Sequence, residues 1–253
     1  MNINKNLIIE ETFNLAVKNH QENKTDIAQD LYNQVLKINP THTDANNNLG
    51  IIFKELGEHQ KAKECFEKAI EIDPSYVKAH NNLGVTLQGL GELQKAKSCY
   101  EKAIEIDPNY ANAHLNLGAI FKELGELEKA KECFEKTIEI DPNYAKAHNN
   151  LGVLFKELGH DQKAKECYEK AIELNPNYVN AHYNIGIIFK ELGEIQKAKD
   201  CYEKAIEIDP LNKKSQVAYG RILLTLNDKL NGYEYIKKGQ GVIKFTPSYY
   251  KII

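Results

Sequence analysis

The stretch that decides the fold is residues 111–144, ANAHLNLGAIFKELGELEKAKECFEKTIEIDPNY. Its first half places Leu117 and Phe121 one helical turn apart, so an apolar stripe runs along one side of a helix. Its second half repeats this spacing with Ala130 and Phe134. A glycine separates the halves and a proline follows the second, because proline cannot continue a helix. The stretch therefore predicts a helix-turn-helix hairpin.

The hairpin recurs along the chain with a fixed period. Prolines recur every 34 residues, at Pro40, Pro74, Pro108, Pro142, Pro176 and Pro210. Glycines keep the same step, at Gly50, Gly84, Gly118, Gly152, Gly186 and Gly220. A single hairpin of this size cannot enclose a core, so each is expected to bury its stripes against the next. We expect Gly118 and its equivalents, which cost about 1 kcal/mol in a helix, to allow the two helices to approach closely.

This period predicts an all-α solenoid with a defined set of units. The six complete units are 9–42, 43–76, 77–110, 111–144, 145–178 and 179–212, after a lead-in at 1–8. Residues 213–238 are expected to form a degenerate seventh unit or capping helices. Residues 239–253 are a tail outside the repeat, interpreted as a segment folded onto the array, a docking strand, or the start of a further domain.

The residues that recur in each unit resemble the tetratricopeptide repeat over about residues 9–226. They are Leu-Gly, an aromatic or leucine three residues on, then alanine, an aromatic, alanine and proline. The resemblance implies a right-handed superhelical solenoid in which the first helix of each hairpin lines the inside. The sequence departs from the family where its frequent tryptophan is replaced by His80, His114, His148 and His182. Polar packing between repeats is expected at these positions.

Asparagines mark the predicted inner face of this solenoid. The sixth residue of five successive units, here called the asparagine ladder, is Asn48, Asn82, Asn116, Asn150 and Asn184. Asparagine is unfavourable inside a helix, so its recurrence needs an explanation. Either duplication of the unit copied a tolerated residue, or each amide bonds to a neighbouring helix, or the amides hold a peptide backbone. Further candidate contacts are the fifth-position asparagines Asn47, Asn81 and Asn149, and Lys54, Lys122, Lys156 and Lys190. Each of these lysines precedes a glutamate, which leaves the charge of the partner open.

The ladder looks like that of the repeat region in O-linked N-acetylglucosamine transferases, where it holds an extended substrate segment. Nothing in the chain resembles a glycosyltransferase domain. The leading hypothesis is therefore a non-enzymatic scaffold that binds a peptide or protein in a concave groove. The alternatives are a substrate-presenting region or subunit of an enzyme, and a structural protein that self-associates through the ends of the array.

Composition and spacing argue against several other classes. The formal net charge is −3, and Arg221 is the single arginine among 33 basic residues, so no nucleic-acid partner is expected. No secretory signal or membrane-spanning run is apparent, which favours a cytoplasmic protein without a membrane partner. The histidines and the five cysteines repeat too far apart to share a metal ion. We expect no metal, no cofactor and no catalytic residues.

Overall fold

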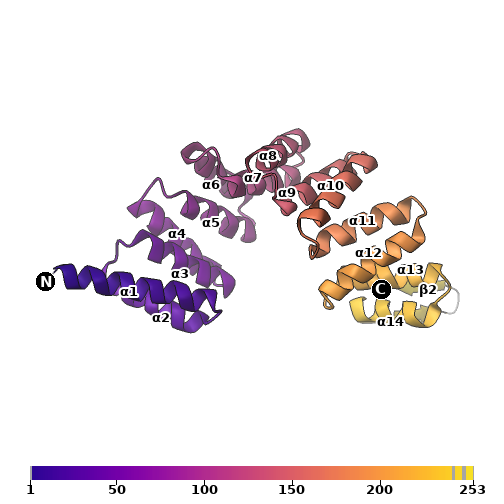
Figure 1. Ribbon diagram of the computed structural model, residues 1–253, viewed down its shortest axis with the longest axis horizontal. Helices are drawn as coiled ribbons and strands as arrows, with labels where there is room; N and C mark the ends of the chain where they lie inside the picture. The colour runs from indigo at the N-terminus through magenta and orange to yellow at the C-terminus, as the bar shows by residue number, and fades with distance from the viewer. Residues whose placement is uncertain (1, 241–242, 247–248, 253) are drawn as a thin grey trace. The chain divides into compact units, whose positions relative to one another are not determined.

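The computed structural model describes residues 2–240, 243–246 and 249–252, with side chains from Lys5 to Gln240. Fourteen helices and two short strands follow one another along these residues (Figure 1). The first helices of the hairpins are α1 (Asn2–Gln21), α3 (Thr43–Glu55), α5 (Val77–Gly89), α7 (Ala111–Glu123), α9 (Ala145–Glu157), α11 (Val179–Glu191) and α13 (Lys213–Thr225). The second helices are α2 (Thr25–Ile38), α4 (His59–Ile72), α6 (Leu93–Ile106), α8 (Leu127–Ile140), α10 (Asp161–Leu174), α12 (Ile195–Ile208) and α14 (Lys229–Gln240).

These helices form hairpins that pack in sequence order within two compact units, residues 1–126 and 127–253. In the first unit α1 pairs with α2, α3 with α4 and α5 with α6. In the second, α9 pairs with α10, α11 with α12 and α13 with α14. Within each unit, the second helix of one hairpin also packs on the first helix of the next. The all-α solenoid of helical hairpins predicted from the period is confirmed.

In four of the hairpins, α3/α4, α5/α6, α9/α10 and α11/α12, the core is a contact between a glycine and an aromatic ring. A Cβ atom added at Gly84 would lie 2.5 Å from the ring of Tyr100, which is fully buried. The same contact joins Gly186 to Tyr202 at 2.6 Å. Fully buried alanines such as Ala96 and Ala103 lie one helical turn on either side of the ring. The predicted close approach of the two helices is therefore confirmed.

The turn between the two helices needs a left-handed backbone. The glycines at this turn have φ between 76° and 78°, a backbone conformation that residues other than glycine rarely adopt. In the first and last hairpins the same role falls to Asn23 and Asn227, with φ of 58° and 67°. Asparagine is one of the few other residues that tolerate this conformation. The first and last hairpins thus keep the turn geometry without the turn glycine.

The histidines that replace the family's tryptophan form hydrogen bonds to the loop between repeats. The Nε2 of His80 lies 3.0 Å from the carbonyl oxygen of Pro74, six residues earlier. Because a carbonyl oxygen can only accept, this ring nitrogen must carry the proton. His114, His148 and His182 repeat the contact with Pro108, Pro142 and Pro176 at 2.9 to 3.1 Å. The predicted polar contact is thus present, and its acceptor is the proline carbonyl.

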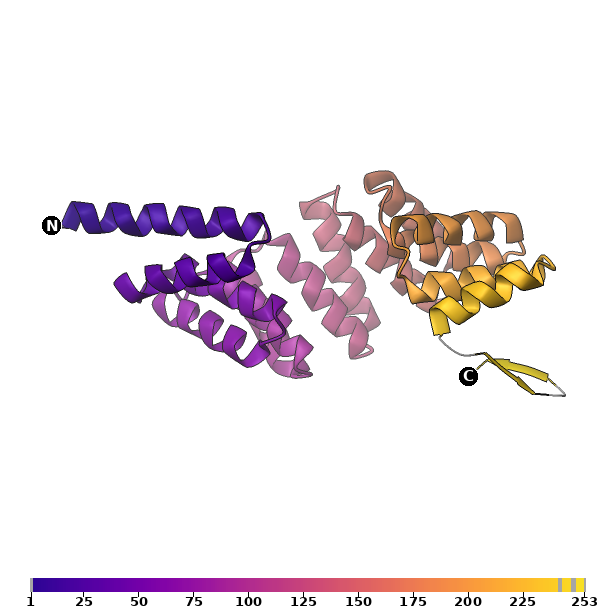
Figure 2. The same ribbon diagram turned by 90° about the horizontal axis from the view of Figure 1, so that it is seen from below.

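The C-terminal hairpin of helices has a different core contact from these four. Gly232 of α14 stands where the other units have a packing alanine, and an added Cβ would lie 3.0 Å from the carbonyl oxygen of Gly220. After α14, strands β1 (Ile243–Thr246) and β2 (Tyr249–Ile252) form an antiparallel pair with Ile243 opposite Ile252 (Figure 2). The three interpretations of the tail stay predictions.

The glycine contact can be tested within one helix. We expect Gly84→Ala to lower the free energy of unfolding by about 1 to 3 kcal/mol, because its methyl group would overlap the ring of Tyr100. Gly89→Ala, at the end of the same helix, meets nothing within 4 Å and should leave stability unchanged or raise it by up to about 1 kcal/mol. Urea unfolding followed by circular dichroism measures both. Equal effects of the two substitutions would contradict the contact.

Candidate functional site

The first helices form the inner face of each compact unit. In the first unit α3 contacts α5 and α5 contacts α7, and in the second α9 contacts α11. Successive second helices, such as α4 and α6, approach one another less. A stack whose first helices lie closer together than its second helices curves toward the first helices. The inner face of each unit, defined by α3, α5 and α7 or by α9 and α11, is therefore the candidate binding surface.

The asparagine ladder lies half-buried on this face, and three of its five amides bond to the first helix of the preceding repeat, whereas Asn150, within residues 5–240, accepts only from Asn149 of its own repeat. The Nδ2 of Asn82 donates to Oδ1 of Asn47 at 3.0 Å. The Nδ2 of Asn116 donates to Oδ1 of Asn81, and that of Asn184 to Oδ1 of Asn149, both at 2.9 Å. The ladder therefore bridges successive first helices, which is one of the roles that the sequence left open.

The fifth-position asparagines supply the other half of each bridge. Asn47, Asn81 and Asn149 are buried, with 2%, 6% and 4% of their surface exposed. Asn47 and Asn149 also donate to the ladder amide of their own repeat, Asn48 at 3.1 Å and Asn150 at 3.5 Å. A buried amide that accepts from one repeat and donates within its own satisfies both ends of its side chain. These residues hold the ladder amides in one orientation.

Part of the hydrogen-bonding capacity of the ladder remains open on the surface. Within residues 5–240, no protein donor bonds to Oδ1 of Asn82, Asn116 or Asn184. Each of these side chains also has a second N–H, because an amide nitrogen carries two donor hydrogens and the bridge uses only one of them. Asn48 differs, because it donates to the hydroxyl of Tyr32 at 3.3 Å and accepts from Asn47. The half-exposed amides at positions 82, 116 and 184 are thus oriented but incompletely bonded.

The four candidate lysines have different surroundings. Lys156 pairs with Asp161 at 3.0 Å and with Glu191 of the next repeat, and these hydrogen bonds raise the pKa of its ammonium group. Lys54 and Lys190 have no ion pair with any residue in the described part of the chain. Lys122 is engaged with other groups of the protein. Contact of these lysines with a ligand stays a prediction.

The cysteines and histidines do not gather into a reactive or metal-binding centre in the described residues. No group of three or more histidine, cysteine or acidic side chains between residues 5 and 240 could hold a metal ion. Burial raises the pKa of Cys65, Cys99, Cys167 and Cys201 from the ordinary 9.0 to about 11. At neutral pH these thiols are protonated and weakly nucleophilic. Among the helices that the structure describes, none combines the length and the hydropathy of a membrane-spanning segment.

Stacked helical hairpins with polar bridges between their first helices define a helical-repeat protein. Family models of the tetratricopeptide repeat match residues 43–76, 75–143, 145–178 and 179–212, which together make up more than half of the chain. The chain therefore belongs to the tetratricopeptide repeat family. Proteins of this family are in general non-catalytic scaffolds for protein-protein interaction, and the repeats of this chain indicate a protein-interaction scaffold.

Solved structures share the same architecture. The chain superposes on pilF of Pseudomonas aeruginosa with a TM-score of 0.69 and 26% identity, over 76% of this chain and 88% of that one. It is 28% identical to MamA, with a TM-score of 0.56 over 64% of this chain and 94% of that one. YrrB, whose crystal structure is described as having an unusual peptide-binding site, is 21% identical, with a TM-score of 0.53 over 73% and 95%. No curated protein matched the sequence.

The amide bridge can be measured with a double-mutant cycle. We expect Asn81→Ala and Asn116→Ala to show a coupling energy of about 1 kcal/mol in urea unfolding, because the two amides share one hydrogen bond. The matched control pairs Asn116→Ala with Asn47→Ala, which bond to different partners, and its coupling should lie within about 0.5 kcal/mol of zero. Equal coupling energies in both cycles would show that the hydrogen bond between Asn81 and Asn116 makes no specific contribution to stability.

The protonated thiols predict slow alkylation. At pH 8 we expect iodoacetamide to modify Cys99, Cys167 and Cys201 roughly a hundredfold more slowly in the folded chain than in urea, since a pKa of about 11 leaves far less thiolate than 9.0. The folded rate should rise as the pH approaches 11. Mass spectrometry separates the three sites, because the tryptic peptides SCYEK, ECYEK and DCYEK differ. A folded rate within tenfold of the unfolded rate would contradict the burial of these thiols.

Proposed function

We propose that the chain is a non-catalytic scaffold that holds an extended peptide segment of a partner protein along the inner faces of its repeats. The observation that carries this proposal is the state of the ladder amides. Asn82, Asn116 and Asn184 are fixed by one bond to the preceding repeat and keep an acceptor and a donor for a ligand. A fixed amide loses little conformational freedom when a ligand binds, which favours affinity.

The same chemistry supports a peptide backbone as the ligand. Each residue of an extended peptide presents one N–H donor and one C=O acceptor, and an asparagine side chain matches both. The ladder would therefore tolerate many partner sequences, because it contacts groups that every residue carries. In this proposal Asn47, Asn81 and Asn149 act as positioning residues, since their burial favours support of the ladder over direct contact with a ligand. The peptide-binding site described for YrrB is a precedent within the same fold.

The experiment selects peptides from a displayed random library with the purified chain and then measures their dissociation constants. Replacing Asn82, Asn116 and Asn184 by alanine should weaken binding at least tenfold, because each lost hydrogen bond costs about 0.5 to 1.5 kcal/mol. The matched control removes three amides from the second helices, at Gln60, Gln162 and Gln196. These exposed side chains bond only to an acidic residue of their own helix.

The outcomes separate the scaffold proposal from a change in folding. The control variant should bind like the natural chain, and both variants should keep the natural helical content by circular dichroism. Recovery of no peptide, or unchanged affinity of a folded ladder variant, would contradict the proposal. Equal weakening by the control variant would place the contact away from the ladder.

A further inference from the structure

The strand pair that follows α14, here called the β1–β2 hairpin, has two faces of different chemistry. Its register joins Ile243 to Ile252 and Phe245 to Tyr250, and alternate positions of a strand lie on the same side of a sheet. One face therefore carries these two apolar pairs, directly opposed across the strands. The other face carries Lys244, Thr246, Tyr249 and Lys251. The β1–β2 hairpin is thus amphipathic.

The apolar face of the hairpin needs a further layer. A pair of strands alone is marginally stable in water unless something packs against its hydrophobic side. Among the described elements, α14 is the helix that contacts the hairpin, through β1. Figure 2 shows the two strands extending beyond α14 rather than lying across the helices of the second unit. We therefore expect the covering layer to come from outside the chain.

The charged residues of this segment are all basic. Residues 237–253 contain no acidic residue and four lysines, which are Lys237, Lys238, Lys244 and Lys251. The register places Lys244 directly opposite Lys251. Like charges opposite one another destabilise a strand pair, so an anionic surrounding would stabilise the hairpin.

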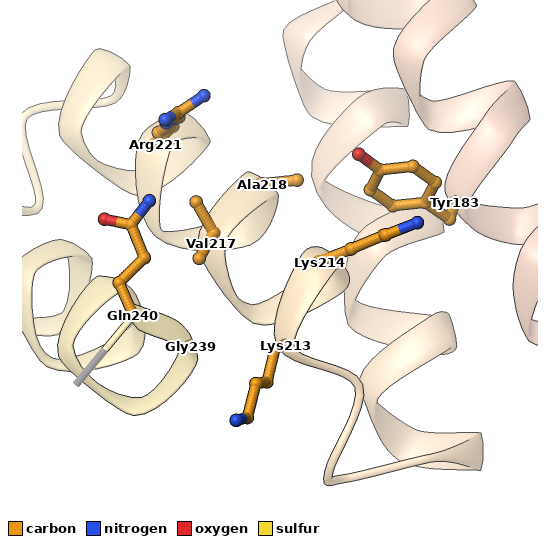
Figure 3. A pocket seen from close by; sticks show the side chains of 8 residues that line it. All are labelled: Tyr183, Lys213, Lys214, Val217, Ala218, Arg221, Gly239 and Gln240. Carbon is orange, nitrogen blue, oxygen red and sulfur yellow. The ribbon is translucent and has the colours of Figure 1, made fainter. Parts of the chain in front are cut away.

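The basic character continues onto the helices beside the hairpin. A pocket of about 290 Å³ lies between α11, α13 and the end of α14, and its cations are Lys213, Lys214 and Arg221 (Figure 3). Gln240, the last residue of α14, lines the same pocket. Within residues 5–240 these three cations have no ion pair. An anionic surface that contacts the hairpin would thus meet further unpaired cations next to it.

The basic segment contrasts with the rest of the sequence. Residues 1–212 contain 25 basic and 34 acidic residues, whereas residues 213–240 contain six basic and two acidic ones. Positive charge gathered at one end of a chain gives that end an attraction for anions that the net charge does not indicate.

Apolar residues that alternate with lysines match the chemistry of a lipid surface. Interfacial elements bury their apolar face about 5 to 10 Å into the boundary between headgroups and acyl chains. Lysines nearby attract anionic headgroups, and their long side chains reach the headgroup level from a polar face. Tyrosine suits the same boundary, because its ring is apolar and its hydroxyl is polar.

Two other occupants match the hairpin less well. Two copies packed through their apolar faces would bring together four lysines of residues 237–253 from each copy, and their repulsion opposes association. A nucleic acid gains from stacking on aromatic rings, whereas one of the two pairs on the apolar face is aliphatic, Ile243 with Ile252. Aliphatic residues gain most from a hydrocarbon surrounding.

We propose that the β1–β2 hairpin binds the chain to an anionic lipid surface. Its apolar face enters the boundary between headgroups and acyl chains, and Lys244 and Lys251 attract the headgroups together with the cations of α13. The expectation of no membrane partner rested on the lack of a spanning run, which contact with a lipid surface does not need. The proposal is independent of peptide binding by the ladder.

The test sediments the full chain with vesicles of phosphatidylcholine that contain about 30% phosphatidylserine. Vesicles of phosphatidylcholine alone should bind roughly tenfold less, because they carry no net charge. Phe245→Ser combined with Ile252→Ser should weaken binding to the anionic vesicles at least tenfold, since it removes one residue from each apolar pair. Lys244→Gln combined with Lys251→Gln should weaken it roughly 10- to 30-fold, because each lysine near an anionic surface contributes about fivefold.

Two matched controls make the same chemical changes elsewhere. Lys170→Gln combined with Lys204→Gln removes two charges from second helices, where each lysine pairs with a glutamate of its own helix. Leu56→Ser combined with Leu192→Ser removes two apolar residues that are 48% and 56% exposed. Both controls should bind the vesicles like the natural chain. All variants should keep the natural helical content by circular dichroism.

Three results would overturn the lipid proposal. They are equal binding to charged and uncharged vesicles, no sedimentation with the anionic vesicles, and effects of the controls as large as those of the hairpin variants. Binding of a labelled single-stranded oligonucleotide that the hairpin variants lose, without vesicle binding, would assign the hairpin to nucleic acid. A dimer in sedimentation equilibrium that the apolar variant loses would assign it to a second copy. The ladder variant should bind vesicles normally, so each proposal can fail without the other.

Discussion

The close contact between a glycine of the first helix and an aromatic ring of the second is the constraint on which the central hairpins α3/α4, α5/α6, α9/α10 and α11/α12 depend. No side chain fits between Gly84 and Tyr100, so the backbone of α5 lies directly on the ring. That approach fixes how far apart the two helices lie and therefore which residues face outward. The ladder amides owe their position to it, since they lie two residues before the glycine on the same helix. The packing of the hairpin and the placement of the ladder amides are thus coupled through one small residue.

The period of 34 residues was enough to predict the hairpins, because glycine, proline and apolar positions recur at a fixed step. The close approach at Gly84 also followed from the sequence, since an unfavourable helix residue needs a compensating contact. The partner of each ladder amide did not follow. Whether Asn116 bonds to Asn81 or to a ligand depends on distances between helices, which spacing along one helix does not contain.

The pocket of about 290 Å³ between α11, α13 and the end of α14 could not be predicted from the sequence. Lys213, Lys214 and Arg221 belong to a degenerate unit, where the repeat pattern no longer indicates which positions face inward. Only the packing of α13 on α12 and α14 assigns their side chains to a hollow. The excess of basic over acidic residues in the segment 213–240 can be read from the sequence. The net charge of −3 for the whole chain conceals it. The charge of each unit taken separately indicates the basic segment, but it does not indicate the pocket.

The amide bridge joins two different positions of successive repeats, a donor at the sixth and an acceptor at the fifth. A unit that carries asparagine at both positions therefore holds both halves of every contact that it makes. Duplicating such a unit whole would insert a matching donor, acceptor, glycine and ring, with no unmatched surface on either side. The span of the inner face can thus grow in steps of one hairpin through copying alone, without redesign of any interface.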